Sequence, residues 1–583
     1  MAVAALRSSW PVLLLGGLAL LEPVSAIFGG GFTRLASWSW VVLAVGSLSA
    51  AWYLILQRLW TAAKARHGML LLVFLGGAWL TFGRLADTSS FPVNREATQQ
   101  VAAGLEAWQK PDLGYHETAF LSGSYPTRQY LLLAIPAKLF GRELVPLRFG
   151  YALLFFTGWA LFLVTLGQRW RGAEDVKAEQ ASPLPVLAAL TVFTFPLVTH
   201  WLFNYEQTIV PLSLTLQTVA WAIDISVTGK RTRLIPLAWS AGMLGTCYST
   251  GLTVWGLCLL LGGALVLFWR HAPVAKREVT RGQFAVTLAY VISMGVSTLW
   301  TMRLILPGKF TTRTIISEEP MATETFWQRV QEGFQALLHH PFFPFFHPFL
   351  ALAFLLPLIV LVARKPSRAT WVPTALWMWM IVTIVAAVTL RGYCHRPPPF
   401  DLHRAMVIVP FLILLAGDFW RSLLRARLEL WTAPLRLFAV ALGAIAVIQA
   451  NDIRDPASYQ PYKSDTEAGF LKQVLSFRNQ LEQKETTPCT IWVDHTLPTC
   501  AGFHEYLGYF FPGATFRRER PNLEELEKTG QPFAALVRDG EEEHRALLNA
   551  RLSAEVLPGA PQLPHLPKQY LMVFQRSGTV IVP

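Results

Sequence analysis

The most informative segments of this chain are FPVNREATQQVAAGLEAW (residues 91–108) and GSYPTRQYLLLAIPAKLFGRELVPLR (residues 123–148). Both belong to one polar loop, residues 84–148, which follows the third strongly hydrophobic run of the sequence. Loops longer than about 15 residues without secondary structure of their own are uncommon in compact domains and are usually functional. We therefore expect this early insertion to carry the chemistry of the protein.

The chain around this loop has the composition of a polytopic membrane protein. Hydrophobic residues make up 53% of its 583 residues and charged residues only 15%, with a mean hydropathy of +0.38. Soluble domains carry about 25% charged residues. Apolar runs of about 18 or more residues, long enough to cross a bilayer as helices, recur along most of the sequence.

We predict an all-α membrane region with about thirteen membrane-spanning helices. They cover residues 11–29, 37–57, 68–84, 146–167, 183–203, 208–226, 235–248, 250–269, 284–305, 347–363, 370–390, 405–420 and 436–450. Lys and Arg cluster in the short loops after alternate spans, which is typical of cytoplasmic loops. This pattern explains the net charge of +13 without a nucleic-acid partner. It places the N-terminus in the cytoplasm, and the long loop and the C-terminal tail outside.

The N-terminal run WPVLLLGGLALLEPVSA (residues 10–26) resembles a secretory signal peptide whose cleavage site would follow Ala26. The alternative is an uncleaved first span. We favour the uncleaved span because it gives the number of spans that the charge pattern requires.

The tail, residues 451–583, has a different sequence pattern from the membrane spans that precede it. It contains apolar runs of strand length at residues 489–494, 533–537 and 569–574, separated by helix-like stretches. This alternation predicts an extracytoplasmic α/β domain of about 110 residues. Neither of the common Gly-rich phosphate-binding motifs occurs in the tail, so its sequence has no nucleotide-site signature.

Glu96 is the first candidate catalytic residue. It lies in NREAT (residues 94–98), where a helix at the membrane surface is expected to begin. The positive end of the helix dipole favours the ionised carboxylate, which would be suited to act as general base on an acceptor hydroxyl. The alternative is an acid that only stabilises the start of a surface helix.

The segment from Gly123 to Gly141 predicts a short helix lying along the bilayer, with Pro126 in its first turn and Gly141 at its C-cap. About fourteen residues are too few to cross a membrane, but they suit an interfacial helix. Such a helix would either anchor the loop or form one wall of a lipid-substrate site.

Glu206, in the outer turn NYEQ (residues 204–207), is the second candidate acid. If it faces the same cavity as Glu96, the two carboxylates suit acid–base chemistry or a divalent cation. The alternative is a solvated loop acid. The cofactor is therefore left open, with a divalent cation as one option.

The outer loop RGYCHRPPPFDLHR (residues 391–404) is basic, against the trend of outer loops. Its candidate residues for binding an anionic ligand are Arg391, His395, Arg396 and Arg404. Arg side chains pair with phosphate through two parallel hydrogen bonds. The alternative is that these side chains reach lipid headgroups at the interface. The His and Asp spacing of the loop matches no standard metal signature.

Together these segments resemble the GT-C superfamily of membrane glycosyltransferases, in particular the branch that contains protein O-mannosyltransferases and the lipid A aminoarabinose transferase. The resemblance rests on REATQQVAAGL (95–105), SYPTRQYLLLAIPAKLFG (124–141), Arg148 and HRAMVIVPFLILLAGDF (403–419). It implies three parts: N-terminal transmembrane helices at residues 1–67, a GT-C-like core at 68–450 that includes the outer loop, and a periplasmic α/β domain at 451–583.

The resemblance also implies an activity: transfer of a sugar from a polyprenyl-phosphate donor to a protein, glycan or lipid acceptor at the outer face of a bacterial inner membrane. Glu96 and Glu206 would then be catalytic, and Arg95 and Tyr125 would lie on the acceptor side. The basic residues of loop 391–404 would bind the lipid phosphate, and membrane lipids would surround the protein.

Arg95 departs from the family pattern, because the first acid of the pair, normally Asp and the expected base, falls on this residue. Arg cannot lose its proton in a protein. Either Glu96 has taken over as base, or the chain is a non-catalytic GT-C-like subunit that scaffolds a larger complex. A transporter is the third option. The few ionisable residues in the spans, with Asp224 and Asp418 near span ends, argue against it.

Overall fold

The computed structural model describes the N-terminal half of the chain most fully. The described residues are 2–64, 68–83, 85–86, 95–111, 113, 128–169, 184–194, 198, 202, 209–246, 281–305, 409–424, 428–452, 474–475, 478–479, 482, 490–493, 508–517, 533–538, 555–557 and 569–574.

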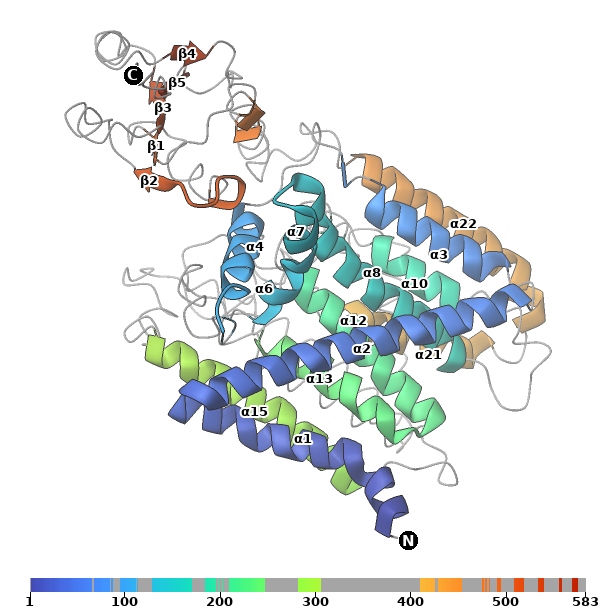
Figure 1. Ribbon diagram of the computed structural model, residues 1–583. Coiled ribbons are helices and arrows are strands. Elements are labelled where there is room, and N and C mark those ends of the chain that lie inside the picture. Colours follow the sequence, from blue (N-terminus) through green and yellow to red (C-terminus); the bar gives the residue numbers. More distant parts are fainter. Residues whose placement is uncertain are drawn as a thin grey trace, which may run out of the picture.

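Two long helices open the chain, α1 (Ala2–Phe28) and α2 (Gly30–Lys64), and α3 (Gly68–Phe82) follows. The chain reverses between α1 and α2 at Gly29 and Gly30, whose φ angles are 65° and 56°. Glycine adopts this left-handed conformation without steric cost. The reversal lets α1 and α2 pack against each other along the lower side of the bundle (Figure 1).

The central helix of the described bundle is α8 (Leu144–Arg169), and nearly all of its side chains are buried. It packs against α10 (Leu184–Thr194) and α12 (Ile209–Thr228) as well as α2 and α3. A methyl group on Gly158 would lie only 2.5 Å from the carbonyl oxygen of Ser213 in α12. Small residues of this kind let helix backbones approach closely in membranes.

The other described helices complete the bundle. They are η1 (Arg231–Arg233), α13 (Leu234–Thr246), α15 (Arg281–Ile305), α21 (Val409–Leu424) and α22 (Leu428–Asp452). Helix α15 packs against α1 and α13, whereas α21 and α22 pack against α10.

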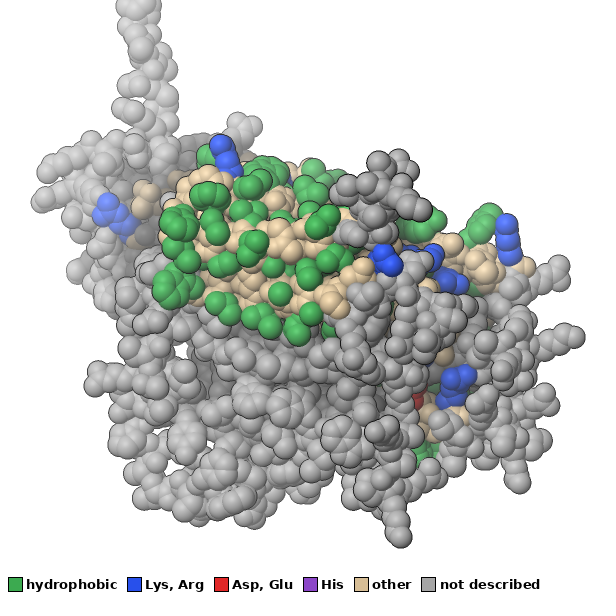
Figure 2. Space-filling model, turned by 90° about the horizontal axis from the view of Figure 1, so that it is seen from below, with side chains coloured by type: hydrophobic (Ala, Val, Ile, Leu, Met, Phe, Trp, Pro, Cys, Tyr) green, Lys and Arg blue, Asp and Glu red, His purple; other side chains and the backbone are tan. Residues whose placement is uncertain are grey.

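Three described helices are long and apolar enough to cross a membrane: Trp10–Phe28, Gly30–Lys64 and Leu144–Arg169. Seen from the side of α1, hydrophobic side chains cover the described surface, with Lys and Arg at its margins (Figure 2). Such a surface suits contact with lipid.

Most predicted spans coincide with a described helix, but the spans predicted at 250–269, 347–363 and 370–390 lie outside the described residues. The total of thirteen therefore stays a prediction.

The outer loop contributes three short helices, α4 (Arg95–Ala107), α6 (Arg128–Leu133) and α7 (Ile135–Phe140). They lie together against one end of the bundle, between it and the C-terminal strands (Figure 1). The segment predicted as one interfacial helix is thus two helices. The break comes before Pro136, which lacks the N–H that a continuous helix would use and stands in the first turn of α7. The predicted C-cap at Gly141 is confirmed.

The C-terminal strands form one five-stranded sheet with the order β2-β1-β3-β5-β4. They are β1 (Thr490–Val493), β2 (Thr515–Arg517), β3 (Phe533–Arg538), β4 (Glu555–Leu557) and β5 (Gln569–Phe574). Strand β1 is parallel to β2 and β3, whereas β5 is antiparallel to β3 and β4. The three predicted strands are confirmed as β1, β3 and β5. The sequence reading missed β2 and β4, which are only three residues long.

Candidate functional site

The predicted site residues fall largely outside the part of the chain that the structure describes. Helix α4 begins at Arg95 and carries Glu96 in its first turn, as expected, but only the backbone of these two residues is described. The remaining predicted residues lie outside the described residues: Tyr125, Glu206, Arg391, His395, Arg396 and Arg404. Their meeting at one site therefore stays a prediction. What the structure does describe is how the outer loop is held.

Helix α4 packs tightly against α6. Ala97 and Val101 are fully buried on α4, and a methyl group on Gly104 would lie 2.2 Å from the carbonyl oxygen of Tyr130 in α6. Only glycine leaves room for this approach. The two helices therefore form one unit.

A buried hydrogen bond ties α4 to the central helix α8. The hydroxyl of Tyr151 in α8 donates to Oε1 of Gln100 in α4 at 2.7 Å. Both side chains are buried, where hydrogen bonds are electrostatically stronger than in water. Gln100 follows Glu96 by one helical turn, so this bond sets the position of the turn that carries the predicted base.

The two ends of the outer loop are joined to each other. Nη1 of Arg148, in the first turns of α8, donates to the carbonyl oxygen of Leu85, just after α3, at 3.1 Å. The Arg148 side chain is fully buried. The arginine that the family resemblance marked at the start of this span therefore closes the base of the loop.

Helix α7 is held from one side and exposed on the other. Nζ of Lys138 in α7 lies 4.4 Å from the centre of the Trp108 ring. The Trp108 indole Nε1 in turn donates to the carbonyl oxygen of Leu131, in the neighbouring helix α6, at 2.9 Å. Leu139 and Phe140 are 69% and 70% exposed. Exposed apolar residues on a short helix beside the membrane bundle fit the predicted interfacial position.

Glu22 is a charged residue that the sequence reading missed. It lies in α1, inside the first predicted span, and its carboxylate accepts two hydrogen bonds from Arg128 at the start of α6. Few ionisable residues were expected within the spans, and Glu22 is one of those few. An acidic residue within an apolar run was the available signal, because such residues usually have a specific partner.

The C-terminal segment contacts the turn between α7 and α8. Nη1 of Arg142 donates to the carbonyl oxygens of Gly508 and Tyr509 at 3.2 and 3.3 Å, and the Tyr509 hydroxyl donates to the carbonyl oxygen of Glu143 at 3.0 Å. Arg478 pairs with the Glu143 carboxylate. Burial raises the pKa of Tyr509 above its ordinary value, although the nearby Arg142 acts in the opposite direction.

The acids that were predicted near span ends are paired at the opposite end of α8. Asp418 accepts from Nη2 of Arg169 at 2.6 Å, and Asp224 pairs with Arg233 at 3.1 Å. These contacts give both acids a structural role.

Among the described residues, no three His, Cys, Asp or Glu side chains are grouped as a metal site would require. The predicted acid Glu206 and the basic loop 391–404 lie outside those residues, so the question of a divalent cation stays open.

No protein-family model matches this sequence, and no curated protein matches it. Solved structures do match it. The crystal structure of ArnT from Cupriavidus metallidurans in the apo state has a TM-score of 0.51 and 14% sequence identity, and the match covers 88% of this chain and 99% of that chain. The structure of ArnT from the same organism bound to undecaprenyl phosphate gives the same score and identity, with 98% of that chain covered.

At 14% identity this likeness concerns the fold. The predicted resemblance to the GT-C branch that contains the lipid A aminoarabinose transferase is confirmed at that level. The fold and the apolar helices together identify a membrane protein.

Proposed function

We propose that this chain is an integral membrane glycosyltransferase that moves a sugar from a polyprenyl-phosphate donor to an acceptor on the extracytoplasmic face. One observation carries the proposal: the chain shares its fold, over 88% of its length, with ArnT, which has been solved bound to undecaprenyl phosphate. We infer that a lipid of the same chemical class carries the donor sugar for this chain.

The outer loop provides the acceptor side. Glu96, in the first turn of α4, takes the proton of the acceptor hydroxyl. The hydroxyl oxygen then bonds to the anomeric carbon while the bond from that carbon to the phosphate oxygen breaks. Arg95 and Tyr125 line the acceptor side, and Glu206 is the second acid.

The leaving polyprenyl phosphate keeps the electron pair of the broken bond. Arg391, His395, Arg396 and Arg404 bind this phosphate and stabilise its charge as it develops. Pre-oriented donors of this type commonly supply the largest electrostatic contribution to catalysis. Whether a divalent cation assists is decided by assaying transfer in the presence and absence of a chelator.

The proposal includes the membrane arrangement. The chain lies in a bacterial inner membrane with about thirteen spans, a cytoplasmic N-terminus and a periplasmic C-terminal α/β domain. The parts are the helices at residues 1–67, the GT-C-like core at 68–450 and the domain at 451–583. The sheet β2-β1-β3-β5-β4 supports the last part.

Arg95 favours a second candidate function, a non-catalytic GT-C-like subunit that scaffolds a complex. In the family pattern this position holds the expected base, and an arginine cannot take up a proton. The fold is compatible with both functions, so a sugar-transfer assay is needed to distinguish them.

The test measures sugar transfer from polyprenyl-phosphate-linked sugars by the purified full chain in detergent. The Glu96→Gln variant should lose transfer by about 100-fold or more, the usual contribution of a general base. Glu106→Gln is the matched control, because Glu106 is an exposed acid in the last turn of the same helix. It should retain activity within about twofold.

Full transfer by Glu96→Gln would remove Glu96 as the base. Absence of transfer by the native chain with every donor, together with stoichiometric partner proteins in the purified sample, would favour the scaffold.

A further inference from the structure

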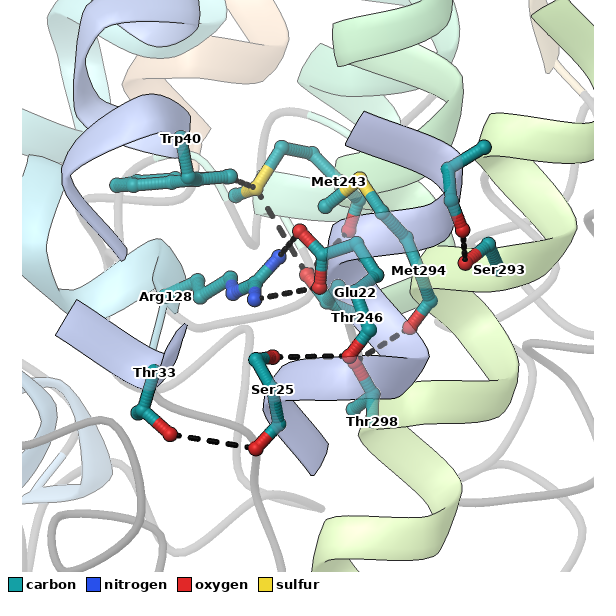
Figure 3. Close-up of polar contacts among 11 residues, drawn as sticks. Glu22, Ser25, Thr33, Trp40, Arg128, Met243, Thr246, Ser293, Met294 and Thr298 are labelled. Atoms are coloured by element: carbon teal, nitrogen blue, oxygen red, sulfur yellow. Dashed lines mark hydrogen bonds and ion pairs between the residues drawn. The ribbon is translucent and has the colours of Figure 1, made fainter. Parts of the chain in front are cut away.

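Helix α1 carries a buried ion pair with the outer loop. Glu22, which is 3% exposed, accepts hydrogen bonds from Arg128, which is 1% exposed and is the first residue of α6. Nη1 donates to Oε1 at 2.9 Å and Nη2 donates to Oε2 at 2.7 Å (Figure 3). Two parallel hydrogen bonds fix the orientation of the partners as well as their distance.

The next residue of α1 explains how Glu22 is held in place. Pro23 lies inside the helix and has no N–H to donate to the carbonyl oxygen of Ala19, one turn earlier. The hydroxyl of Ser293 in α15 donates to that oxygen at 2.6 Å instead. A neighbouring helix thus satisfies the carbonyl group that proline leaves free, as a membrane interior requires. This contact anchors α1 to α15 at the level of Glu22.

One hydrogen bond within α1 and one from α2 lie at the end of α1. The Ser25 hydroxyl donates to the carbonyl oxygen of Glu22 at 2.8 Å, and the Thr33 hydroxyl donates to the carbonyl oxygen of Ser25 at 3.3 Å. Figure 3 shows these side chains gathered around the ion pair, at the meeting point of α1, α2, α6 and α15. These contacts therefore hold the part of α1 that directs the Glu22 carboxylate towards α6.

The position of α6 determines the position of α4. The Tyr130 carbonyl oxygen lies where any side chain at Gly104 would clash, and the carbonyl oxygen of Leu133, the last residue of α6, lies 2.6 Å from a methyl group placed on Gly150 in α8. At both contacts α6 has no room to move closer to α4 or α8 unless those helices move as well. The contacts therefore run from Glu22 through Arg128 to α6, and from α6 to the helix that begins with Arg95 and Glu96.

We infer that Glu22, acting through Arg128, is a positioning residue that holds α6 and α4, and with them the first turn of α4, in the orientation that sugar transfer requires. This inference rests on the proposed function. It assigns to α1, a helix outside the GT-C-like core at residues 68–450, a direct part in building the acceptor side.

The test compares the full-length native chain with Glu22→Gln in two measurements, sugar transfer and hydrogen exchange of the α4 and α6 amides. Glutamine keeps the size of the side chain but not its charge. We expect kcat per folded molecule to fall about tenfold or more, because small misplacements of reacting groups are costly. The KM for the polyprenyl-phosphate sugar should change less than threefold, and the α4 and α6 amides should exchange faster.

Two further variants sharpen the comparison. Arg128→Lys keeps the charge but loses the two parallel hydrogen bonds, and should give an intermediate kcat. Asp224→Asn is the matched control, because it breaks a buried ion pair with Arg233 at the opposite end of the bundle. It should leave kcat and the exchange of the α4 and α6 amides at native values.

Native exchange of α4 and α6 in Glu22→Gln would overturn the inference, and so would native kcat despite faster exchange. If Glu22→Gln fails to fold, the double variant Glu22→Leu/Arg128→Met removes both charges, a change that buried pairs often tolerate. Native kcat in the double variant would also overturn the inference. If the native chain transfers no sugar, the proposed function fails, and the exchange measurement alone decides whether Glu22 positions α4.

Discussion

Contacts of single residues hold the outer loop in the part of the chain that the structure describes. Gly104 lets α4 approach the Tyr130 carbonyl group, Tyr151 binds Gln100, and Arg148 binds the Leu85 carbonyl group. The sequence marked Arg148 as the start of the next span, but it did not indicate the partner. The partner depends on where the end of α3 lies in space.

Replacing Gly104 by Val should destabilise the outer loop. Its Cβ would lie 2.2 Å from a backbone oxygen of α6, so α4 and α6 would have to separate. Overpacking of this kind costs about 1–3 kcal/mol. Thermal unfolding in detergent should show a lower Tm. Gly46→Ala in α2 is the control, since a methyl group there contacts nothing within 4 Å. An unchanged Tm for Gly104→Val would contradict the packing of α4 on α6.

Removing the Tyr151 hydroxyl should weaken the attachment of α4 to α8. Tyr151→Phe deletes the donor of a buried 2.7 Å hydrogen bond to Gln100, and a lost bond of this kind costs about 1 kcal/mol. The Tm in detergent should fall, and amides of α4 should exchange faster. Tyr53→Phe is a matched control because Tyr53 is exposed. Equal Tm values for both variants would argue against a stabilising bond.

At the scale of helices and strands, local pattern and local chemistry predicted much of what the structure contains. The start of α4, the Gly141 C-cap and strands β1, β3 and β5 followed from helix signals and apolar runs. The break between α6 and α7 was not predicted, although Pro136 lacks the backbone N–H that a continuous helix would use. Strands β2 and β4 were missed because three residues give too short a pattern.

Helix α7 should rest at the membrane interface. Its exposed residues Leu139 and Phe140 would otherwise face water, and burying them in the boundary of the bilayer is favourable. A spin label on Phe140→Cys in proteoliposomes should be more accessible to oxygen than to a water-soluble nickel complex. A label on Glu106→Cys, exposed on α4, serves for comparison. Preferential access of the nickel complex at residue 140 would place α7 in water.

At the scale of the whole molecule, the C-terminal segment is joined to the membrane region through the turn that contains Arg142 and Glu143. Tyr509 and Glu143, which are hydrogen-bonded there, are 366 positions apart in the sequence. The same turn leads from the outer loop into α8. The C-terminal segment therefore contacts the chain between the proposed acceptor side and the central helix.

This contact should weaken at alkaline pH. Burial raises the pKa of Tyr509 above its ordinary value of 10.0, so the docked state favours the neutral phenol. The resulting stabilisation is complete below the ordinary pKa and is lost as pH rises above it towards the raised pKa. The amide hydrogen exchange rates of residues 508–510, divided by the intrinsic rates of an unfolded chain at the same pH, should be constant between about pH 7 and 9. Above about pH 10 this ratio should rise. Tyr509→Phe should remove this extra alkaline dependence, and an unchanged dependence would exclude Tyr509 as its source.

Local sequence patterns alone indicate the class of the protein and the places of most helices and the longer strands. These features follow from apolar run length, periodicity and capping residues, which act within a few residues of one another. Helix packing, by contrast, determines that Glu22 pairs with Arg128, Gln100 with Tyr151, and Arg142 with the backbone at Tyr509. Such partners are set by the angles and spacings at which helices pack, and no local pattern in the chain encodes those.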